Sequence, residues 1–244
     1  MAETLGLDSK YTFGAVALDF RIVSPDYFQA KTWHEPTNYA FAAGYPLIPL
    51  FGPEALAASE EMPLAVVQGR FGWEFVAVCG AQLHQNVWIH QGNWMARYTP
   101  AFLMHYPFVA AEDVDGQTGL AFDLQSSLLG GEWDGIPFFA PSYDLVGKTA
   151  KRYEAIRPYI ALRREMKELL DILSDAEAIT SWPAEGQYPF DMDFPKLYTL
   201  DYEVVKSMNL SLSLMKNAEP LARSMQQSLN RLPRLAALVG RQPL

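Results

Sequence analysis

Short apolar runs separated by turn residues occupy the middle of the chain. Between residues 63 and 124 these runs are rich in Val, Phe, Trp and Ile, a composition typical of antiparallel strands. The runs are residues 63–71, 74–82, 86–91, 108–113 and 118–124. The last two flank Asp115 and Gly116, and an Asp-Gly pair between apolar runs favours a hairpin because both residues tolerate positive φ. The pattern predicts a small antiparallel sheet.

Helical periodicity replaces this pattern after residue 148. Residues 149–174 place apolar side chains on one stripe, as an amphipathic helix requires. The stripe consists of Tyr153, Ile156, Ile160, Met166, Leu169 and Leu173. Arg164 and Glu168 lie four residues apart on the polar side, the spacing of a helical ion pair. Pro158 is expected to kink this helix or split it in two.

Further short elements are marked by caps and prolines. Residues 196–200 predict a strand, after which Asp201 is placed to cap a helix over residues 202–208. A last helical region is expected over residues 219–238, with Pro220 at its start and Pro233 opening its final piece.

Two shorter helices are expected earlier in the chain. Pro53 can occupy the first turn of a helix that Pro63 ends. Thr99 can cap a turn of helix that begins at Pro100 and is closed by Pro107.

The order of the elements predicts an α+β fold. Strands come first and helices later, so we expect a small antiparallel sheet in the N-terminal two-thirds, packed with C-terminal helices. Residues 1–44 are aromatic and interrupted by prolines, which favours an irregular N-terminal arm. Residues 45–244 then form a single α+β domain.

Composition narrows the classes of function. Half of the 244 residues are hydrophobic, enough for a folded core. The formal net charge of −9 opposes nucleic-acid binding, which needs clustered Lys and Arg. The start of the chain is not typical of a secretory signal, and the sequence has no run of about 18 apolar residues, so we expect a cytoplasmic protein without membrane insertion. The single cysteine, Cys79, lies in an apolar run and is expected to be a buried small hydrophobe.

Residues capable of acid–base or metal chemistry are present without a diagnostic arrangement. None of the histidines (His34, His84, His90 and His105) has the spacing of a metal site, although an unbroken strand would place His84 and His90 on one face. The carboxylate pairs 132/134 and 191/193 lie in polar loops, where they are usually solvated. Phosphate-binding and nucleophile motifs are absent. We therefore assign no catalytic residue, metal ligand or cofactor.

Residues 94–108, WMARYTPAFLMHYPF, resemble the most characteristic segment of the bacterial SapC family, which runs as Trp, a spacer, Tyr-x-Pro and then Tyr-Pro-Phe. The resemblance continues in family order over about residues 45–238. It includes YPLIPL, MPLAVV, LLDILSDAEAI followed by Trp182, KLYTLD and the closing Leu-rich helices. Two positions depart from it. Met104 and His105 replace a common basic pair, and Met225 and Gln226 replace a common Ala-His pair.

The resemblance implies a binding or accessory role more than an enzyme. The family is named after a protein associated with a surface layer, and some members are encoded near tryptophan halogenases or receptors for nutrient uptake. Our leading hypothesis is a non-enzymatic protein that binds a protein or peptide partner through an aromatic surface. The candidate binding residues are Trp94, Arg97, Tyr98, Pro100, His105, Tyr106 and Phe108.

Two alternatives remain open at this point. The chain could be an enzyme, or an enzyme partner, acting on a small aromatic or peptide substrate, with His105 or His90 transferring the proton. It would then have a pocket that holds one of these histidines beside a carboxylate. It could also be a self-assembling structural protein, and therefore a homo-oligomer. The aromatic candidates could equally fill the core beneath the sheet.

Overall fold

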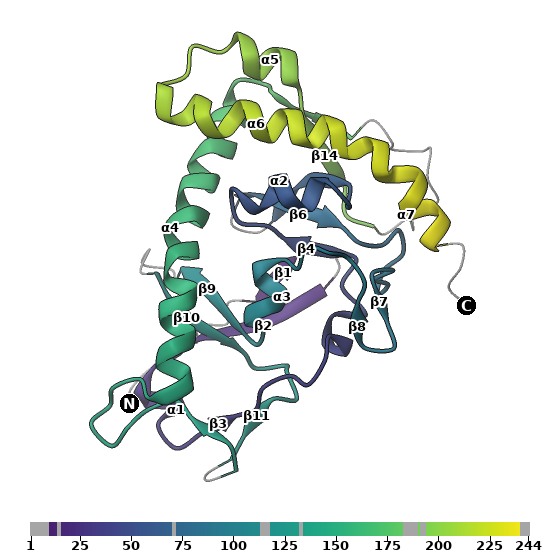
Figure 1. Cartoon of the computed structure of the whole chain (residues 1–244). Coiled ribbons are helices and arrows are strands. Elements are labelled where there is room, and N and C mark those ends of the chain that lie inside the picture. The colour runs from purple at the N-terminus through teal and green to yellow at the C-terminus, as the bar shows by residue number, and fades with distance from the viewer. Residues whose placement is uncertain are drawn as a thin grey trace. The chain divides into compact units, whose positions relative to one another are not determined.

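The computed structural model describes residues 10–13, 16–69, 72–112, 118–131, 134–182, 190 and 194–239 (Figure 1). The described chain forms two compact units. The first unit combines Ala17–Thr37 with His105–Ala161, and the second combines Asn38–Met104 with the residues from Leu162 onward. The division into residues 1–44 and 45–244 that the sequence favoured stays a prediction.

The first unit contains a four-stranded sheet in the order β1-β2-β10-β9. Its strands are β1 (Lys10–Phe13), β2 (Val16–Ile22), β9 (Phe108–Glu112) and β10 (Thr118–Asp123). β9 and β10 pair antiparallel, with Phe108 opposite Phe122, so the expected hairpin strands are confirmed, while turn residues 113–117 lie outside the described residues. β2 pairs antiparallel with β10, so the expected arm contributes a regular strand.

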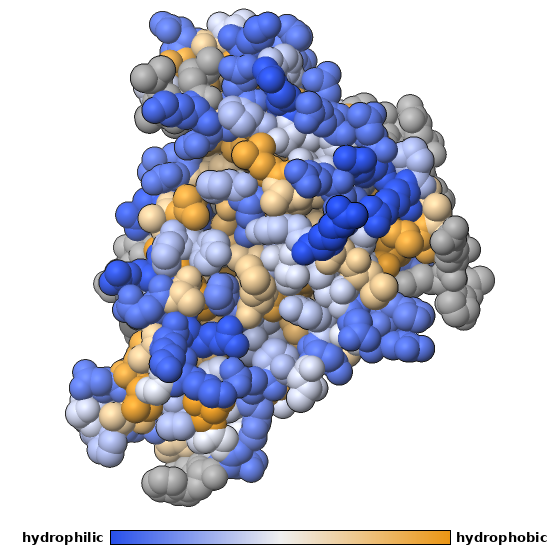
Figure 2. All heavy atoms as spheres, viewed as in Figure 1, coloured by the Kyte–Doolittle hydropathy of each residue, from blue (hydrophilic) through white to orange (hydrophobic). Residues whose placement is uncertain are grey.

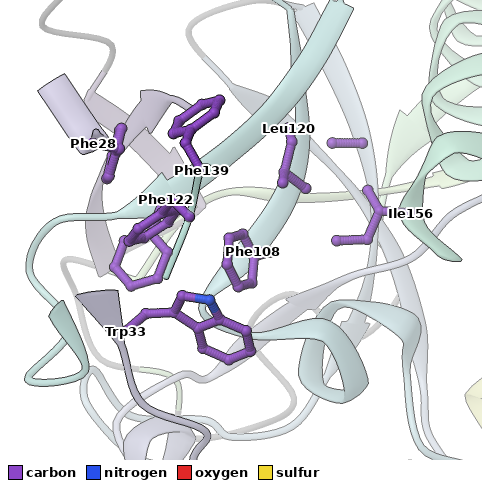
Figure 3. Close-up of a cluster of buried hydrophobic side chains, with 9 residues drawn as sticks. Phe28, Trp33, Phe108, Leu120, Phe122, Phe139 and Ile156 are labelled. Carbon is purple, nitrogen blue, oxygen red and sulfur yellow. The ribbon is translucent and has the colours of Figure 1, made fainter. Parts of the chain in front are cut away.

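An aromatic core fills the first unit. Trp33 of β3 (Thr32–Trp33) packs edge-on against Phe108 with ring centroids 4.7 Å apart, and Phe108 meets Phe122 at 5.1 Å (Figure 3). Such edge-to-face pairs add to the free energy of burial because ring edges and faces carry opposite partial charges. The Trp33 indole N–H donates to the Thr149 hydroxyl at 2.8 Å, so this buried polar group is satisfied. β3 also pairs with β11 (Leu129–Gly130) and β12 (Ile136–Pro137).

The second unit is built on a five-stranded antiparallel sheet in the order β13-β14-β5-β6-β4. Its strands are β4 (Leu47–Pro49), β5 (Leu64–Gly69), β6 (Gly72–Val78), β13 (Ile179–Ser181) and β14 (Leu197–Leu200). The residues of β5 from Leu64 to Val67 are all buried, which explains why this strand is continuously apolar instead of alternating. Helices α2 (Glu54–Ser59) and α6 (Leu212–Ser228) pack against this sheet and against each other.

The remaining elements are short, apart from one long helix. α4 spans Gly147–Asp175 and carries Pro158 inside. The others are α1 (Pro25–Phe28), the 3-10 helix η1 (Ala40–Ala42), β7 (Ile89–His90), β8 (Asn93–Trp94), α3 (Ala101–His105), α5 (Tyr202–Ser207), the 3-10 helix η2 (Leu229–Arg231) and α7 (Leu232–Val239).

The predicted α+β class is confirmed, with the strands divided over several antiparallel sheets. Of the two effects expected of Pro158, a kink or a split, the split does not occur, because α4 is continuous from Gly147 to Asp175. Pro158 lies on the exposed side, where the carbonyl that loses its helical donor can bond to water. The expected start of the last helical region was wrong, since α6 begins at Leu212 and contains Pro220. The Asp201 cap is confirmed, because its carboxylate accepts from the N–H groups of Glu203 and Val204.

Candidate functional site

The middle of the candidate segment is a turn that leads from β8 into α3. We call residues 94–101 the anchored turn. The Trp94 indole N–H donates to the carbonyl of Tyr98 at 2.8 Å, which closes the turn across four residues. All residues of this turn belong to the second unit.

Two glutamates from the region of α2 hold the anchored turn. Oε2 of Glu61 accepts from the backbone N–H of Arg97 at 2.5 Å and of Tyr98 at 3.2 Å. Oε2 of Glu54 accepts from the Tyr98 hydroxyl at 3.0 Å and from the N–H of Ala101 at 3.2 Å. Glu54 therefore satisfies an amide at the start of α3, the task that the sequence assigned to Thr99. Four hydrogen bonds, three of them from backbone amides, thus fix the turn to these two side chains.

Burial changes the acidity of one anchor. Burial raises the pKa of Glu54 to about 7, an effect that outweighs the lowering by its hydrogen bonds to Phe51, Ala101 and Tyr98. Its second oxygen, Oε1, is buried without a hydrogen-bond partner. Glu54 is therefore a carboxyl that titrates near neutral pH while it holds the turn.

An arginine from α7 supports the second anchor. Nη1 of Arg234 lies 3.9 Å from Oε1 of Glu61, and the guanidinium stands 4.8 Å from the ring centroid of Trp88, within cation–π range. The Trp88 ring in turn lies 6.5 Å from that of Trp94. Trp88 and Arg234 thus contact the anchored turn through Trp94 and through its anchor Glu61.

Two side chains of the anchored turn reach solvent. Met95 is 58% exposed, and Arg97 is exposed while its backbone is held by Glu61. Trp94 and Tyr98 are half-buried, and Pro100 is buried. The turn presents a flexible apolar side chain and a cation on a fixed backbone.

The other three candidates, His105, Tyr106 and Phe108, belong to the first unit. Tyr106 and Phe108 are buried, at 4% and 1% exposure, and the Tyr106 hydroxyl donates to Asp123 at 2.8 Å. The seven candidates therefore divide between the units, and Pro100, Tyr106 and Phe108 have the burial of core residues.

His105 is half-buried at the end of α3. Its Nδ1 is buried without a hydrogen-bond partner, and its ring lies 5.6 Å from that of Tyr159. Burial, together with the positive charge of Arg152, lowers the pKa of His105, so the imidazole is neutral at physiological pH.

The remaining histidines are His34, His84 and His90, which lie outside the candidate segment. Nε2 of His34 lies 3.9 Å from a carboxylate oxygen of Asp134, and both side chains are exposed. No unbroken strand connects His84 and His90, because β7 begins at Ile89 and His84 has a φ of 62°, so the condition for placing both histidines on one face is not met. Cys79 is buried as predicted, and burial raises its thiol pKa. Glu132, Asp191 and Asp193 lie outside the described residues.

Two larger features are absent from the part of the chain that the structure describes. Within it, no cluster of three or more His, Cys, Asp or Glu side chains could hold a metal ion. Among the same residues, no helix is both long and apolar enough to cross a membrane.

Sequence reasoning missed the anchoring residues Glu54, Glu61 and Arg234. The first two belong to a segment with ordinary helical composition, and more than 30 residues separate them from the amides that they bind. No local pattern reports a pairing over such a distance.

The comparisons with known proteins agree with the resemblance of residues 94–108. A family model described as SapC matches residues 23–235, an earlier start than the resemblance from residue 45. No curated protein and no solved structure matches the chain. Because the family model covers most of its length, the chain belongs to the SapC family.

Proposed function

We propose that this protein is a non-enzymatic binding or accessory protein that engages a protein or peptide partner through the anchored turn. The observation that carries the proposal is the contrast between a fixed backbone and exposed side chains. Glu54 and Glu61 bind three backbone amides of the turn, while Met95 and Arg97 remain open to solvent.

This arrangement suits recognition for two physical reasons. Met and Arg are enriched at interfaces between proteins, Met because it adapts to irregular surfaces and Arg because it combines donors with a flat apolar face. A loop that is already ordered also loses less conformational entropy on binding. The half-buried rings of Trp94 and Tyr98, in the same turn, add apolar surface to that of Met95 and Arg97.

The proposal also includes the cellular compartment and the systems with which the protein is associated. A cytoplasmic accessory role beside a surface-layer, nutrient-uptake or halogenase system is compatible with what the family resemblance implies. The acidic net charge favours a protein or peptide partner over a nucleic acid.

His105 favours the enzyme alternative only in part. Its neutral, half-buried imidazole could accept a proton, and its Nδ1 lacks a partner. However, the charged side chain that shifts its pKa is Arg152, whereas the hypothesis required a carboxylate beside the histidine. The anchored turn therefore has the stronger support.

Photo-crosslinking tests the proposed surface directly. A photoreactive amino acid replaces Met95 in the full chain, which is expressed in its source cells and irradiated. We expect a discrete crosslinked adduct that Arg97→Glu diminishes, because the substitution reverses the charge without touching the anchored backbone. Tyr143, which is 64% exposed and lies in the first unit, provides the matched control position. Equal adducts from positions 95 and 143, or an adduct indifferent to Arg97→Glu, would refute the proposal.

A further inference from the structure

The second unit has an open groove that the anchored turn does not use. Its lining is contributed by α2 and the two residues before it, by α4 from Leu162 onward and by α6, and its volume is about 400 Å³. The apolar part consists of Leu56, Leu162, Met166, Leu169, Pro220 and Leu221. A second hollow of about 560 Å³ shares Leu56, Lys216 and Pro220 with it and continues along α6. We call the two together the α6 groove. Figure 2 shows hydrophobic side chains at the surface where α2 lies beside α6, bordered by hydrophilic ones.

Leu56 lines both hollows of the α6 groove. It is 47% exposed, although leucine is normally buried. Leu56 follows Glu54 by two residues, about 200° around the helix, so α2 directs Glu54 to the anchored turn and Leu56 to the groove. An exposed leucine in a hollow lined by other apolar side chains favours an apolar occupant.

The charges on the walls specify the occupant further. Glu165 and Glu168 project from α4, and Lys216 projects from α6. Among the described residues none of the three has an ion-pair partner, and the expected pair between Arg164 and Glu168 is not formed. Within the described ranges, the α4 side of the groove thus carries two carboxylates without an ion-pair partner. The α6 side carries the ammonium of Lys216 without one, next to the ion pair that Glu219 and Arg223 form with each other.

The walls also favour a helical occupant over an extended one. α4 and α6 use most of their backbone groups within their own helices, and the carbonyl that Pro220 leaves without a helical donor is a single group, so these two walls offer no strand edge to an extended peptide. A helix satisfies its own backbone and needs only side-chain contacts. From Lys216 to Gln227 the groove follows α6 for about 16 Å, the length of three helical turns.

We propose that the α6 groove binds an amphipathic α-helix of a partner protein. Leucine-type side chains at i and i+4 of that helix pack on Leu56 and Pro220. Its Lys or Arg side chains face Glu165 and Glu168, and an acidic residue on its other flank faces Lys216. This second surface does not depend on the anchored turn.

A display library tests the proposal on the full chain. Helical peptides of roughly 16 residues with a randomised face are selected against the wild-type protein, and the affinities of enriched peptides are measured by fluorescence anisotropy. We expect apolar residues at i and i+4 with Lys or Arg on one flank. Leu56→Asp should weaken the binding at least about tenfold, because a carboxylate would be buried under the peptide.

Charge variants separate the groove from general electrostatic attraction. The double variant Glu165→Lys and Glu168→Lys should also lose at least about tenfold in affinity and should prefer peptides of reversed charge. The double variant Asp171→Lys and Asp175→Lys is the matched control, since it makes the same change of net charge at exposed positions of α4 outside the groove lining and should leave the affinity unchanged. Met95→Ala, in the anchored turn, should also leave the peptide affinity unchanged. The groove and the anchored turn are therefore tested independently of each other.

Several results would overturn the proposal. Peptides that bind Leu56→Asp as tightly as wild type, or a selection that yields no peptide sensitive to this variant, would remove the groove as the binding site. Enriched peptides without helical spacing would remove the helical occupant. A wild-type dimer in light scattering that Leu56→Asp dissociates would assign the groove to a second copy of the chain.

Discussion

The protonation of Glu54 should make the stability of the fold depend on pH. Its pKa is raised from 4.5 to about 7 because the side chain is buried beside the anchored turn. In the unfolded chain the carboxyl ionises near 4.5, so the folded state holds its proton more tightly. The stabilisation is therefore fully present below pH 4.5 and is lost as the pH rises through about 7.

The structure also sets the size of the effect. A pKa difference between 4.5 and about 7 corresponds to about 3 kcal/mol of unfolding free energy. This is an upper value, because solvent that reaches the ionised carboxylate would reduce the cost of its burial. Glu54→Gln should abolish this dependence, since an amide does not titrate. Its carbonyl can still accept from Tyr98 and Ala101.

Urea unfolding of both proteins at several values between pH 5 and pH 9 measures the effect. The quantity of interest is the unfolding free energy of wild type minus that of Glu54→Gln. Other titrating groups, such as Glu74, Asp123 and His105, contribute equally to both proteins and cancel. We expect the difference to fall by up to about 2.5 kcal/mol from pH 5 to pH 9, because the first part of the change lies between pH 4.5 and pH 5. A flat difference would show that Glu54 is not a buried titrating anchor.

Three further substitutions test other buried contacts by chemical unfolding at neutral pH. Arg163→Met removes the cation 3.1 Å from the largely buried Glu74 and should destabilise the fold by about 3 kcal/mol, because it leaves that carboxylate unpaired. Tyr106→Phe removes the hydrogen bond to Asp123 and should cost about 1–3 kcal/mol, while the pKa of Asp123 rises further above its usual range. Phe108→Ala should cost about 3–5 kcal/mol, because it opens a cavity in the aromatic core.

Each of these substitutions has a control. Adding Glu74→Gln to Arg163→Met should restore most of the stability, and no recovery would mean that the lost packing of the arginine stem dominates. Leucine at position 106 would lose both the hydroxyl and the ring, so a loss no larger than that of Tyr106→Phe would contradict the burial of the ring. Met95→Ala should change the unfolding free energy by less than about 0.5 kcal/mol, and a larger loss would show that Met95 is a core residue.

Local chemistry in the sequence was enough to predict many elements. The apolar runs correspond to β5, β6, β9 and β10, and the stripe of residues 149–174 corresponds to α4. The Asp201 cap was found because a cap bonds to amides only two and three residues away. The family was also recognisable, because its most characteristic segment is contiguous in residues 94–108, and the family model matches residues 23–235.

Sequence patterns failed where neighbours in space decide the outcome. Pro220 is a helix starter by local rules, yet it lies inside α6 because residues on both sides of it, including Ala218 and Ala222, are buried. The candidate aromatic segment looked continuous, but burial divided it into the exposed Met95 and Arg97 and the core residues Tyr106 and Phe108.

By itself, the sequence determined the α+β class, most of the strands and helices, and the SapC family. Only the tertiary structure decided that Glu54 and Glu61 hold the anchored turn, and that Leu56 lines a groove together with Glu165, Glu168 and Lys216. The physical reason is the distance along the sequence over which each interaction acts. Caps, turns and hydrophobic periods act over a few residues, whereas burial, pKa shifts and grooves depend on residues that only folding brings together.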